Sequence, residues 1–502
     1  MTAFVATEIE LKLTIDPAHV TRLRNHPMLK TAGQEKSRRR KLYSVYFDTP
    51  DRDLYQSGIA LRLRRTGRCW MQTVKGGGSS EGGMHQRQEW EWPVQGMEPE
   101  LIPDAAHAPA NLLTPDILVR LRPLFITDFW RTVWKLRTIN GDEVELALDQ
   151  GAVFSGEKSF PISEVELELK VGAASSLFEV ALAIQEHVFL RVEDVSKAER
   201  GYRLHGGELP LPRMSREVEL VSEMSAEQAF RCIVRECIGQ LQGNVAEIGR
   251  IHNPEYLHQA HVATRRLHMI LGWLAVRLPD ATDNVMEELR WLMGCLGKAR
   301  DWDVFISQTL PQIANEMSDN QTLQRLRENA VGLCHAQYQE VVGAVLSQRY
   351  TRLVLKLGLI AVRQADQDGK RAAILERLAG QILSRQYKCL RRKGRKYAAM
   401  SPAEYHSLRI AAKKLRYAVE FFACLYPRKR ARHFLSVLAA LQDSLGELND
   451  AVVTQRLLGE LHVTRGYGAG IVYGWTVCSA RCGLQKMHLV WSELMRRKPF
   501  WQ

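Results

Sequence analysis

The feature that most constrains the fold of this chain is the alternation of charged and apolar residues along its first part. In residues 7–14, Glu8, Glu10 and Lys12 alternate with apolar side chains. Successive side chains of a β-strand point to opposite faces, so this spacing predicts a strand with one charged and one apolar face. The pattern recurs in residues 61–64, 70–75, 87–92, 131–137, 143–149 and 164–170.

Short helical stretches interrupt these predicted strands at 17–29, 115–123 and 174–190. The Pro-rich stretch from Pro93 to Pro115 predicts a long connection. We therefore expect the first part of the chain to form an α+β domain that is mainly antiparallel sheet.

The alternation leaves two arrangements of these strands open. In one, the strands form an open antiparallel sheet whose charged face lies in water. In the other, they close into a barrel with the charged face inward, and the lumen is then a binding site because charges are not enclosed without partners.

The charged pairs indicate which ligand such a lumen would take. Carboxylate pairs such as Glu8/Glu10 and Glu164/Glu166 suit a hard divalent cation, Mg²⁺ or Mn²⁺. Paired Arg and Lys side chains suit phosphate oxygens. A metal, several cations and several carboxylates together favour phosphoryl transfer.

The positive charge of the chain is unevenly distributed. The net charge is +13, but residues 1–212 hold 27 basic and 29 acidic side chains, whereas residues 213–502 hold 42 and 27. A basic domain favours an anionic partner such as nucleic acid, acidic lipid or polyphosphate, although a solvated surface without a specific partner has the same composition.

The change in charge coincides with a Gly- and Pro-containing stretch, GGELPLPR, at residues 206–213. A chain of 502 residues is too long for one compact domain. We therefore expect one domain over residues 1–205, a linker over 206–219 and a second domain over 220–502.

The second part of the chain is helical in pattern and internally repeated. Ser225 and Gln228 are spaced as a helix-capping box, and apolar residues follow at three- and four-residue spacing. HQAHVATRRLH at 258–268 matches HSLRIAAKKLR at 406–416, and LGKARD at 296–301 matches LGELND at 445–450. Two motifs in the same order and at nearly the same spacing predict an all-α domain built from two related halves.

Each half carries a stripe of basic residues along one helix face. Like charges along such a face repel by roughly 0.2–0.5 kcal/mol per pair, so an anion that relieves the repulsion explains why the stripe is repeated. A solvated basic face is the alternative. The candidate anion-binding residues are His258, His261, Arg265, Arg266 and His268 in the first half and His406, Arg409, Lys413, Lys414 and Arg416 in the second.

Other features of the sequence predict a cytoplasmic protein without disulfides or membrane contact. No apolar run approaches the roughly 20 residues that a membrane helix needs. The first residues lack the basic start and apolar core of a secretion signal. The nine cysteines are scattered, without a CxxC pair or a His/Cys cluster at zinc spacing.

The first part resembles the CYTH domain of the triphosphate tunnel metalloenzymes. Glu8–Lys12 matches the ExExK signature, and the other motifs follow in order: Tyr46–Thr49, Arg62–Arg64, Lys75, Arg87–Glu91, Arg131, Asp149, Glu164–Glu166 and Ser196–Arg200. The resemblance implies an eight-stranded antiparallel tunnel that admits a linear triphosphate and a divalent metal.

The resemblance also implies roles for particular residues. The implied metal ligands are Glu8, Glu10, Asp149, Glu164 and Glu166. The implied substrate-binding residues are Lys12, Arg62, Arg64, Lys75, Arg87, Glu89, Arg131, Lys197 and Arg200, with Glu89 or Glu91 as the inward carboxylate of its strand. The implied catalytic set is Glu8, Glu10, Lys12, Lys75, Glu164 and Glu166.

The second part resembles the CHAD domain, a conserved-histidine helical domain, over residues 220–502. The resemblance implies two helical bundles around a basic groove that binds inorganic polyphosphate. The family commonly has Arg where His261 and His268 stand. Since His is mostly uncharged at neutral pH, we expect polyphosphate affinity in this half to be weaker or to depend on pH.

Taken together, the sequence predicts an inorganic triphosphatase that cleaves tripolyphosphate to pyrophosphate and phosphate with Mg²⁺ or Mn²⁺. One alternative is a polyphosphate-binding protein with little turnover. Another is a tunnel phosphatase acting on thiamine triphosphate or a nucleoside triphosphate. Nucleic-acid binding is disfavoured because no DNA- or RNA-binding module is recognised.

Overall fold

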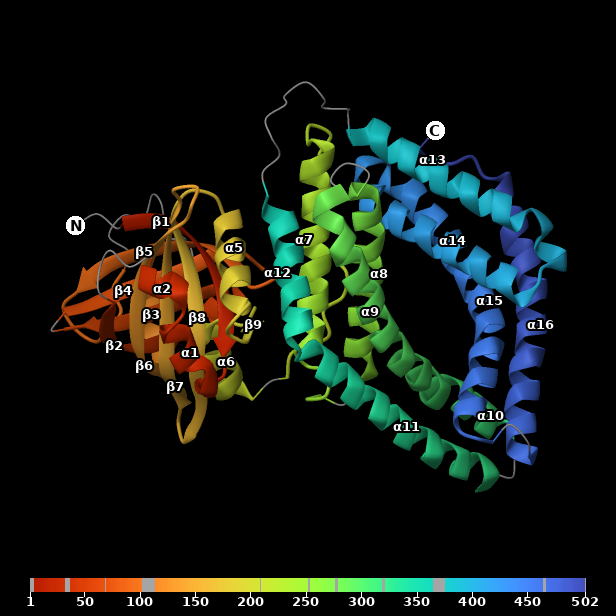
Figure 1. Cartoon of the computed structure of the whole chain (residues 1–502), viewed down its shortest axis with the longest axis horizontal. Helices are drawn as coiled ribbons and strands as arrows, with labels where there is room; N and C mark the ends of the chain where they lie inside the picture. Colours follow the sequence, from red (N-terminus) through yellow and green to blue (C-terminus); the bar gives the residue numbers. More distant parts are fainter. Residues whose placement is uncertain are drawn as a thin grey trace. The chain divides into compact units, whose positions relative to one another are not determined.

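The chain forms two compact units, which are coloured along the sequence in Figure 1. The first unit contains Met1–Leu211 together with Leu346–Arg363, and the second contains Pro212–Val345 together with Gln364–Gln502. The computed structural model describes residues 4–31, 37–67, 69–101, 113–207, 209–251, 253–275, 279–317, 321–363, 375–463 and 466–501. Residues 102–112 of the predicted Pro-rich connection lie outside these ranges.

The first unit is built around an antiparallel barrel. Its strands are β1 (Phe4–Ile15), β2 (Arg38–Asp48), β3 (Ile59–Thr66), β4 (Cys69–Glu81), β5 (Met84–Val94), β6 (Arg122–Arg137), β7 (Glu143–Ser155), β8 (Lys158–Val171) and the short β9 (Leu190–Val192). The strand order is β5-β4-β3-β2-β6-β7-β8-β1-β9, and an additional β1–β5 pairing closes the first eight strands. The eight-stranded antiparallel barrel predicted from the sequence is therefore confirmed.

The register of the strands places the charged residues inside this barrel. Lys12 lies opposite Glu166 and Glu8 lies opposite Arg87. Directly opposed residues share a face of the sheet, so the charged residues of β1 lie on the same face as the charged residues of its neighbours β5 and β8. The other parity, which includes Leu11 and Leu13, belongs to a buried apolar cluster outside the barrel. Of the two arrangements left open by the sequence, the closed barrel with an inward charged face is the one formed.

Helices cover the outside of the barrel and one of its ends. They are α1 (Val20–Arg24), α2 (Pro27–Thr31), α3 (Asp53–Gln56), α4 (Pro115–Arg120), α5 (Ser175–Gln185), α6 (Lys197–Gly206) and α12 (Gln348–Val362). The apolar face of α5, with Leu177 and Phe178, packs on the outer face of β8. The first turn of α6 carries Lys197 and Arg200, both of which pair with lumen carboxylates.

Helix α12 belongs to the first unit although it follows α11 in the chain. The sequence predicts one helical domain over residues 220–502, and residues Leu346–Arg363 depart from this prediction. Leu355 is fully buried in the same apolar cluster as Phe178. Gln185 Nε2 donates a hydrogen bond of 2.9 Å to the carbonyl oxygen of Gln348. The apolar face of α12 therefore completes the outer core of the barrel.

The second unit is mainly helical in its described part, with one isolated bridge between Ile248 and Ile251. Its helices are α7 (Ala226–Val245), α8 (Pro254–Leu274), α9 (Pro279–Val304), α10 (Leu310–Asn315), α11 (Gln321–Val345), α13 (Leu375–Lys393), α14 (Pro402–Phe422), α15 (Arg428–Glu460) and α16 (Tyr467–Arg496). The predicted capping box of Ser225 and Gln228 begins α7, and an equivalent box begins α14. Helix α8 packs between α7 and α9, as α14 packs between α13 and α15, so the duplicated motifs occupy equivalent helices.

Within the described residues, no helix combines the length and the apolar character needed to cross a membrane.

Candidate active site and anion-binding cluster

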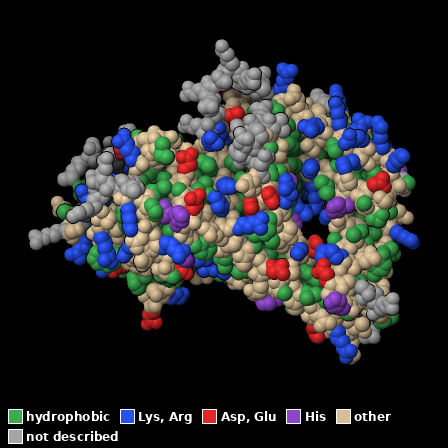
Figure 2. Space-filling view, in the orientation of Figure 1, with side chains coloured by type: hydrophobic (Ala, Val, Ile, Leu, Met, Phe, Trp, Pro, Cys, Tyr) green, Lys and Arg blue, Asp and Glu red, His purple; other side chains and the backbone are tan. Residues whose placement is uncertain are grey.

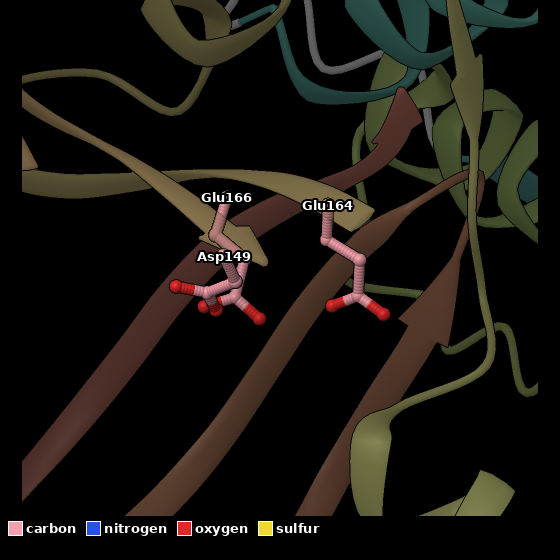
Figure 3. Close-up of side chains that lie close together, drawn as sticks. All are labelled: Asp149, Glu164 and Glu166. Carbon is pink, nitrogen blue, oxygen red and sulfur yellow. The ribbon is translucent and has the colours of Figure 1, made fainter. Parts of the chain in front are cut away.

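The deepest part of the lumen holds three carboxylates around one ammonium group. Asp149 on β7 and Glu164 and Glu166 on β8 are buried, and their oxygens approach within 4.8 Å of one another (Figure 3). Lys197 Nζ lies 2.8 Å from Asp149, 2.6 Å from Glu164 and 2.8 Å from Glu166. Three buried oxygen donors around one cation are the donor set that a divalent metal prefers, so these residues fit such an ion.

Arg131 and Arg200 surround the same carboxylates. Arg131 forms a bidentate pair with Asp149, with nitrogen–oxygen distances of 2.8 and 2.6 Å, and also pairs with Glu166. Burial raises the pKa of Asp149, but Arg131 and Lys197 outweigh it and keep the pKa below its usual value. Arg200 pairs with Glu164. All three acidic groups of this cluster are therefore matched by cations.

Glu8 and Glu10 lie on the neighbouring wall, and their environments differ. Lys75 pairs with Glu8, and despite burial it lowers the pKa of Glu8 to about 2. Burial together with the nearby Glu166 raises the pKa of Glu10, although Lys12 Nζ lies 3.1 Å from both Glu10 and Glu166. Lys12 thus links the β1 carboxylates to the three-carboxylate cluster.

The opposite side of the lumen carries more positive charge than its carboxylates balance. Arg62 lies 3.2 Å from Glu89, which also contacts Lys75, whereas Glu91 is 3.9 Å from Arg62 and more exposed. Glu89 and Glu91 share the inward parity of β5, and Glu89 is the less exposed of the two. Arg64 donates from Nε to Ser44 Oγ at 3.2 Å and has no ion pair among the described residues.

The electrostatics of Arg64 indicate where an anion would bind. Burial, Arg62 and Arg131 lower the pKa of Arg64 to about 9. A half-buried guanidinium whose pKa is lowered by two neighbouring cations gains stability from any anion placed beside it. Arg87, opposite Glu8 on β1, extends this basic wall.

Two uncharged residues of the lumen were not among the predicted site residues. Tyr46 is buried, and although burial raises its pKa, Arg62 and Arg64 lower it below the usual value. His85 on β5 lies directly opposite Glu10. Both residues alternate in phase with the inward-facing charged residues of their strands, so this alternation could have identified them. They were not selected because neither carries a charge.

In the second unit, the two repeated stripes face each other. Lys413 on α14 interacts electrostatically with Arg265 on α8, as well as with Arg409 and Asp450. His258 and His261 interact with Arg265 and Lys413, and also with Arg300 of α9, which was not predicted. Figure 2 shows a hollow in this unit with Lys and Arg side chains around it.

The cations of this cluster depress one another. Burial, Arg265 and Arg409 lower the pKa of Lys413 to about 6. Burial, Arg265 and Lys413 lower the pKa of His261 well below its usual value. The matched acidic residues of the repeats, Asp301 and Asp450, face the cations, and burial raises the pKa of both.

The other predicted residues of the stripes have different partners. Arg266 is buried, donates a hydrogen bond of 2.7 Å from Nη1 to Gln240 Oε1, and lies over the ring of Phe421. His406 hydrogen-bonds to Asn449, and Arg416 donates to Glu420 and Gln442. Burial lowers the pKa of His268, and the like charges of Arg290 and Lys414 lower it further. Direct electrostatic interactions therefore link His258, His261, Arg265, Arg409 and Lys413 of the predicted set.

The fold and these sites define a protein of two parts, a closed barrel with a charged lumen and a duplicated helical unit with a basic centre. Residues 6–202 match the CYTH domain family and residues 232–459 match the CHAD domain family. The chain therefore contains a CYTH domain followed by a CHAD domain.

Known proteins show similarity to each part. An inorganic triphosphatase of Haemophilus influenzae is 33% identical over 197 residues, which are 39% of this chain and 54% of that protein. The structure of the CHAD domain from the plant Ricinus communis is 29% identical, covers 55% of this chain and 96% of that one, and gives a TM-score of 0.47.

A third similar structure comes from Hippeastrum and is described as a putative adenylyl cyclase with a dominant triphosphatase activity. It is 17% identical, covers 41% of this chain and 98% of that one, and gives a TM-score of 0.29. The matched part of the chain spans about half the length of the Haemophilus influenzae inorganic triphosphatase.

Proposed function

We propose that this protein is a divalent-metal-dependent triphosphatase that hydrolyses tripolyphosphate to pyrophosphate and phosphate inside the barrel. The observation that carries the proposal is the division of the lumen into a three-carboxylate cluster and a basic wall with the unbalanced Arg64. Fully ionised tripolyphosphate carries five negative charges, so it needs several fixed cations on one side and a metal on the other. The matched relative from Haemophilus influenzae is named for the same activity.

The lumen residues divide the work of binding. Arg62, Arg64 and Arg87 would hold the phosphate oxygens, since guanidinium groups match them in geometry and charge. Asp149, Glu164 and Glu166 would hold Mg²⁺ or Mn²⁺, with Glu8 and Glu10 on the adjoining wall. A metal bound there would supply positive charge to the phosphoryl group during transfer.

Lys197 would change partners when a metal binds. Its ammonium lies among the three carboxylates that would coordinate the ion. This ammonium would be repelled by a divalent cation held among the three carboxylates, and a phosphate oxygen of the substrate would be a suitable new partner. We therefore expect Lys197 to contact the triphosphate once a metal occupies the carboxylate cluster.

A phosphate-release panel tests this proposal. Purified full-length protein is given tripolyphosphate, ATP, thiamine triphosphate or long-chain polyphosphate, each with Mg²⁺, with Mn²⁺ and with a chelator. We expect the highest kcat/KM with tripolyphosphate and loss of turnover with the chelator. Faster turnover of a nucleoside or thiamine triphosphate would make that compound, and not tripolyphosphate, the proposed substrate. No turnover of any compound, with tight tripolyphosphate binding, would favour the binding-protein alternative.

We further propose that the second unit binds inorganic polyphosphate through His258, His261, Arg265, Arg300, Arg409 and Lys413. The mutual depression of these cations supports the proposal, because a flexible polyanion would relieve it. A titration of labelled polyphosphate against full-length protein tests it. Arg265→Ala should weaken binding at least tenfold, whereas the control Arg377→Ala, on the exposed side of α13, should not. Equal affinity of the two variants would place polyphosphate elsewhere.

A further inference from the structure

His85 is an uncharged residue among the charged side chains of the lumen. It lies on β5, opposite Glu10 on β1 and opposite Ser80 on β4. Opposed residues share a face, so His85 faces the lumen as Glu10 does. Only 1% of its surface is exposed.

The neighbours of His85 decide which ring nitrogen carries the proton. Nε2 lies 3.4 Å from Ser80 Oγ and 3.5 Å from the carbonyl oxygen of Glu193. Ser80 Oγ already donates its own proton to the carbonyl oxygen of Asp194 at 3.1 Å. Both groups near Nε2 are therefore acceptors, which assigns the proton to Nε2 and leaves a lone pair on Nδ1.

Nδ1 is consequently a buried acceptor without a donor. It has no hydrogen-bond partner among the residues that the structure describes. Burial, Lys12 and Arg87 hold the pKa of His85 well below its usual value, so the ring stays neutral. An unsatisfied buried acceptor is destabilising, and a ligand with a suitable donor would recover that cost.

The chemistry of an acceptor limits what it can bind in this lumen. An ionised phosphate oxygen is itself an acceptor, so it gains nothing from Nδ1. Water carries O–H donors and is the second reactant of triphosphate hydrolysis. The lone pair of Nδ1 therefore suits the water and not the phosphate chain.

We propose that Nδ1 of His85 accepts a hydrogen bond from the attacking water, which makes His85 a further catalytic residue of the barrel. This inference rests on the proposed triphosphatase activity. The water oxygen forms a bond to a terminal phosphorus as the bridging P–O bond breaks, and the bond's electron pair leaves with pyrophosphate. One water proton stays on the released phosphate, the other goes to the pyrophosphate oxygen, and His85 remains neutral throughout.

Three substitutions separate this role from a structural one. His85→Leu removes the acceptor and keeps a side chain of similar bulk, whereas His85→Asn retains an acceptor close to the position of Nδ1. We expect kcat of His85→Leu to fall about ten- to a hundredfold with KM nearly unchanged, because misplaced water slows only the chemical step. His85→Asn should retain most of kcat. Added imidazole should partly restore kcat of His85→Ala.

Calorimetric binding of tripolyphosphate shows whether each variant still folds around its substrate. Binding at wild-type affinity with lowered kcat supports the inference. Three results overturn it: wild-type kcat in His85→Leu, an equal loss in His85→Leu and His85→Asn without imidazole rescue of His85→Ala, or a loss expressed in KM. If the wild-type protein itself releases no phosphate from tripolyphosphate, the proposed function fails, and that outcome is distinct from the other three.

Discussion

Replacing Gly358 on α12 by alanine tests whether this helix is part of the barrel unit. A Cβ atom at Gly358 would lie 2.1 Å from Cε1 and 2.7 Å from Cζ of Phe178. Phe178 belongs to α5, and its side chain is 1% exposed in the core that this helix covers. The ring cannot swing into solvent, so α5 and α12 must separate or repack.

The expected magnitude follows from two opposed effects. Gly→Ala within a helix stabilises by about 0.5–1 kcal/mol when nothing obstructs the new methyl group. Overpacking a core costs about 1–3 kcal/mol. We therefore expect Gly358→Ala to destabilise the barrel unit by up to about 2.5 kcal/mol. Gly343 on α11 has no atom within 4 Å of its would-be Cβ and is exposed, so Gly343→Ala is the matched control and should be stabilising.

Hydrogen–deuterium exchange resolves the two units separately, which a single melting curve does not. Gly358→Ala should speed exchange in peptides covering β8 and α5 and leave peptides covering α8 unchanged. Gly343→Ala should not speed exchange in β8 and α5. Unchanged exchange in β8 and α5 of Gly358→Ala, or faster exchange only in the second unit, would refute the placement of α12.

Two further predictions concern charge. Lys197→Met should raise the affinity for Mg²⁺ or Mn²⁺ measured by calorimetry, since the ammonium no longer competes for the three carboxylates. The exposed control Lys158→Met should leave this affinity unchanged. Unchanged affinity in Lys197→Met would exclude the competition. Polyphosphate affinity should rise as the pH falls from 8 to 6, by at most about tenfold per pH unit for each group, because the bound anion favours protonated Lys413, whose pKa is lowered to about 6. Lys413→Met should flatten this dependence, and a flat wild-type titration would contradict it.

The sequence predicted the strands of the barrel better than their closure. Alternation such as that of Glu8–Lys12 is identical in an open sheet and in a closed barrel, because it reports only which face each side chain takes. Closure depends on the pairing of β1 with β5, in which Glu8 meets Arg87 across a long separation in the chain. The resemblance to CYTH domains supplied what the local pattern lacked.

The helix α12 and the uncharged lumen residues show a different limit. The apolar spacing of residues 348–362 predicts a helix, but nothing in it indicates which unit the apolar face packs against. His85 and Tyr46 have the right parity, but a neutral side chain on a strand is more often part of a core than of a binding site. Arg300 lies within a repeated motif, yet its counterpart in the other half is Asn449, so the repeat gave no reason to select it.

The most direct test of the central proposal is metal-dependent phosphate release from tripolyphosphate by Glu8→Gln and Glu10→Gln, with Glu157→Gln in an exposed turn as control. Circular dichroism confirms that each variant is folded. We expect turnover in Mg²⁺ or Mn²⁺ to be abolished in the two lumen variants and preserved in the control. Normal turnover by Glu8→Gln and Glu10→Gln would contradict a reaction inside the barrel.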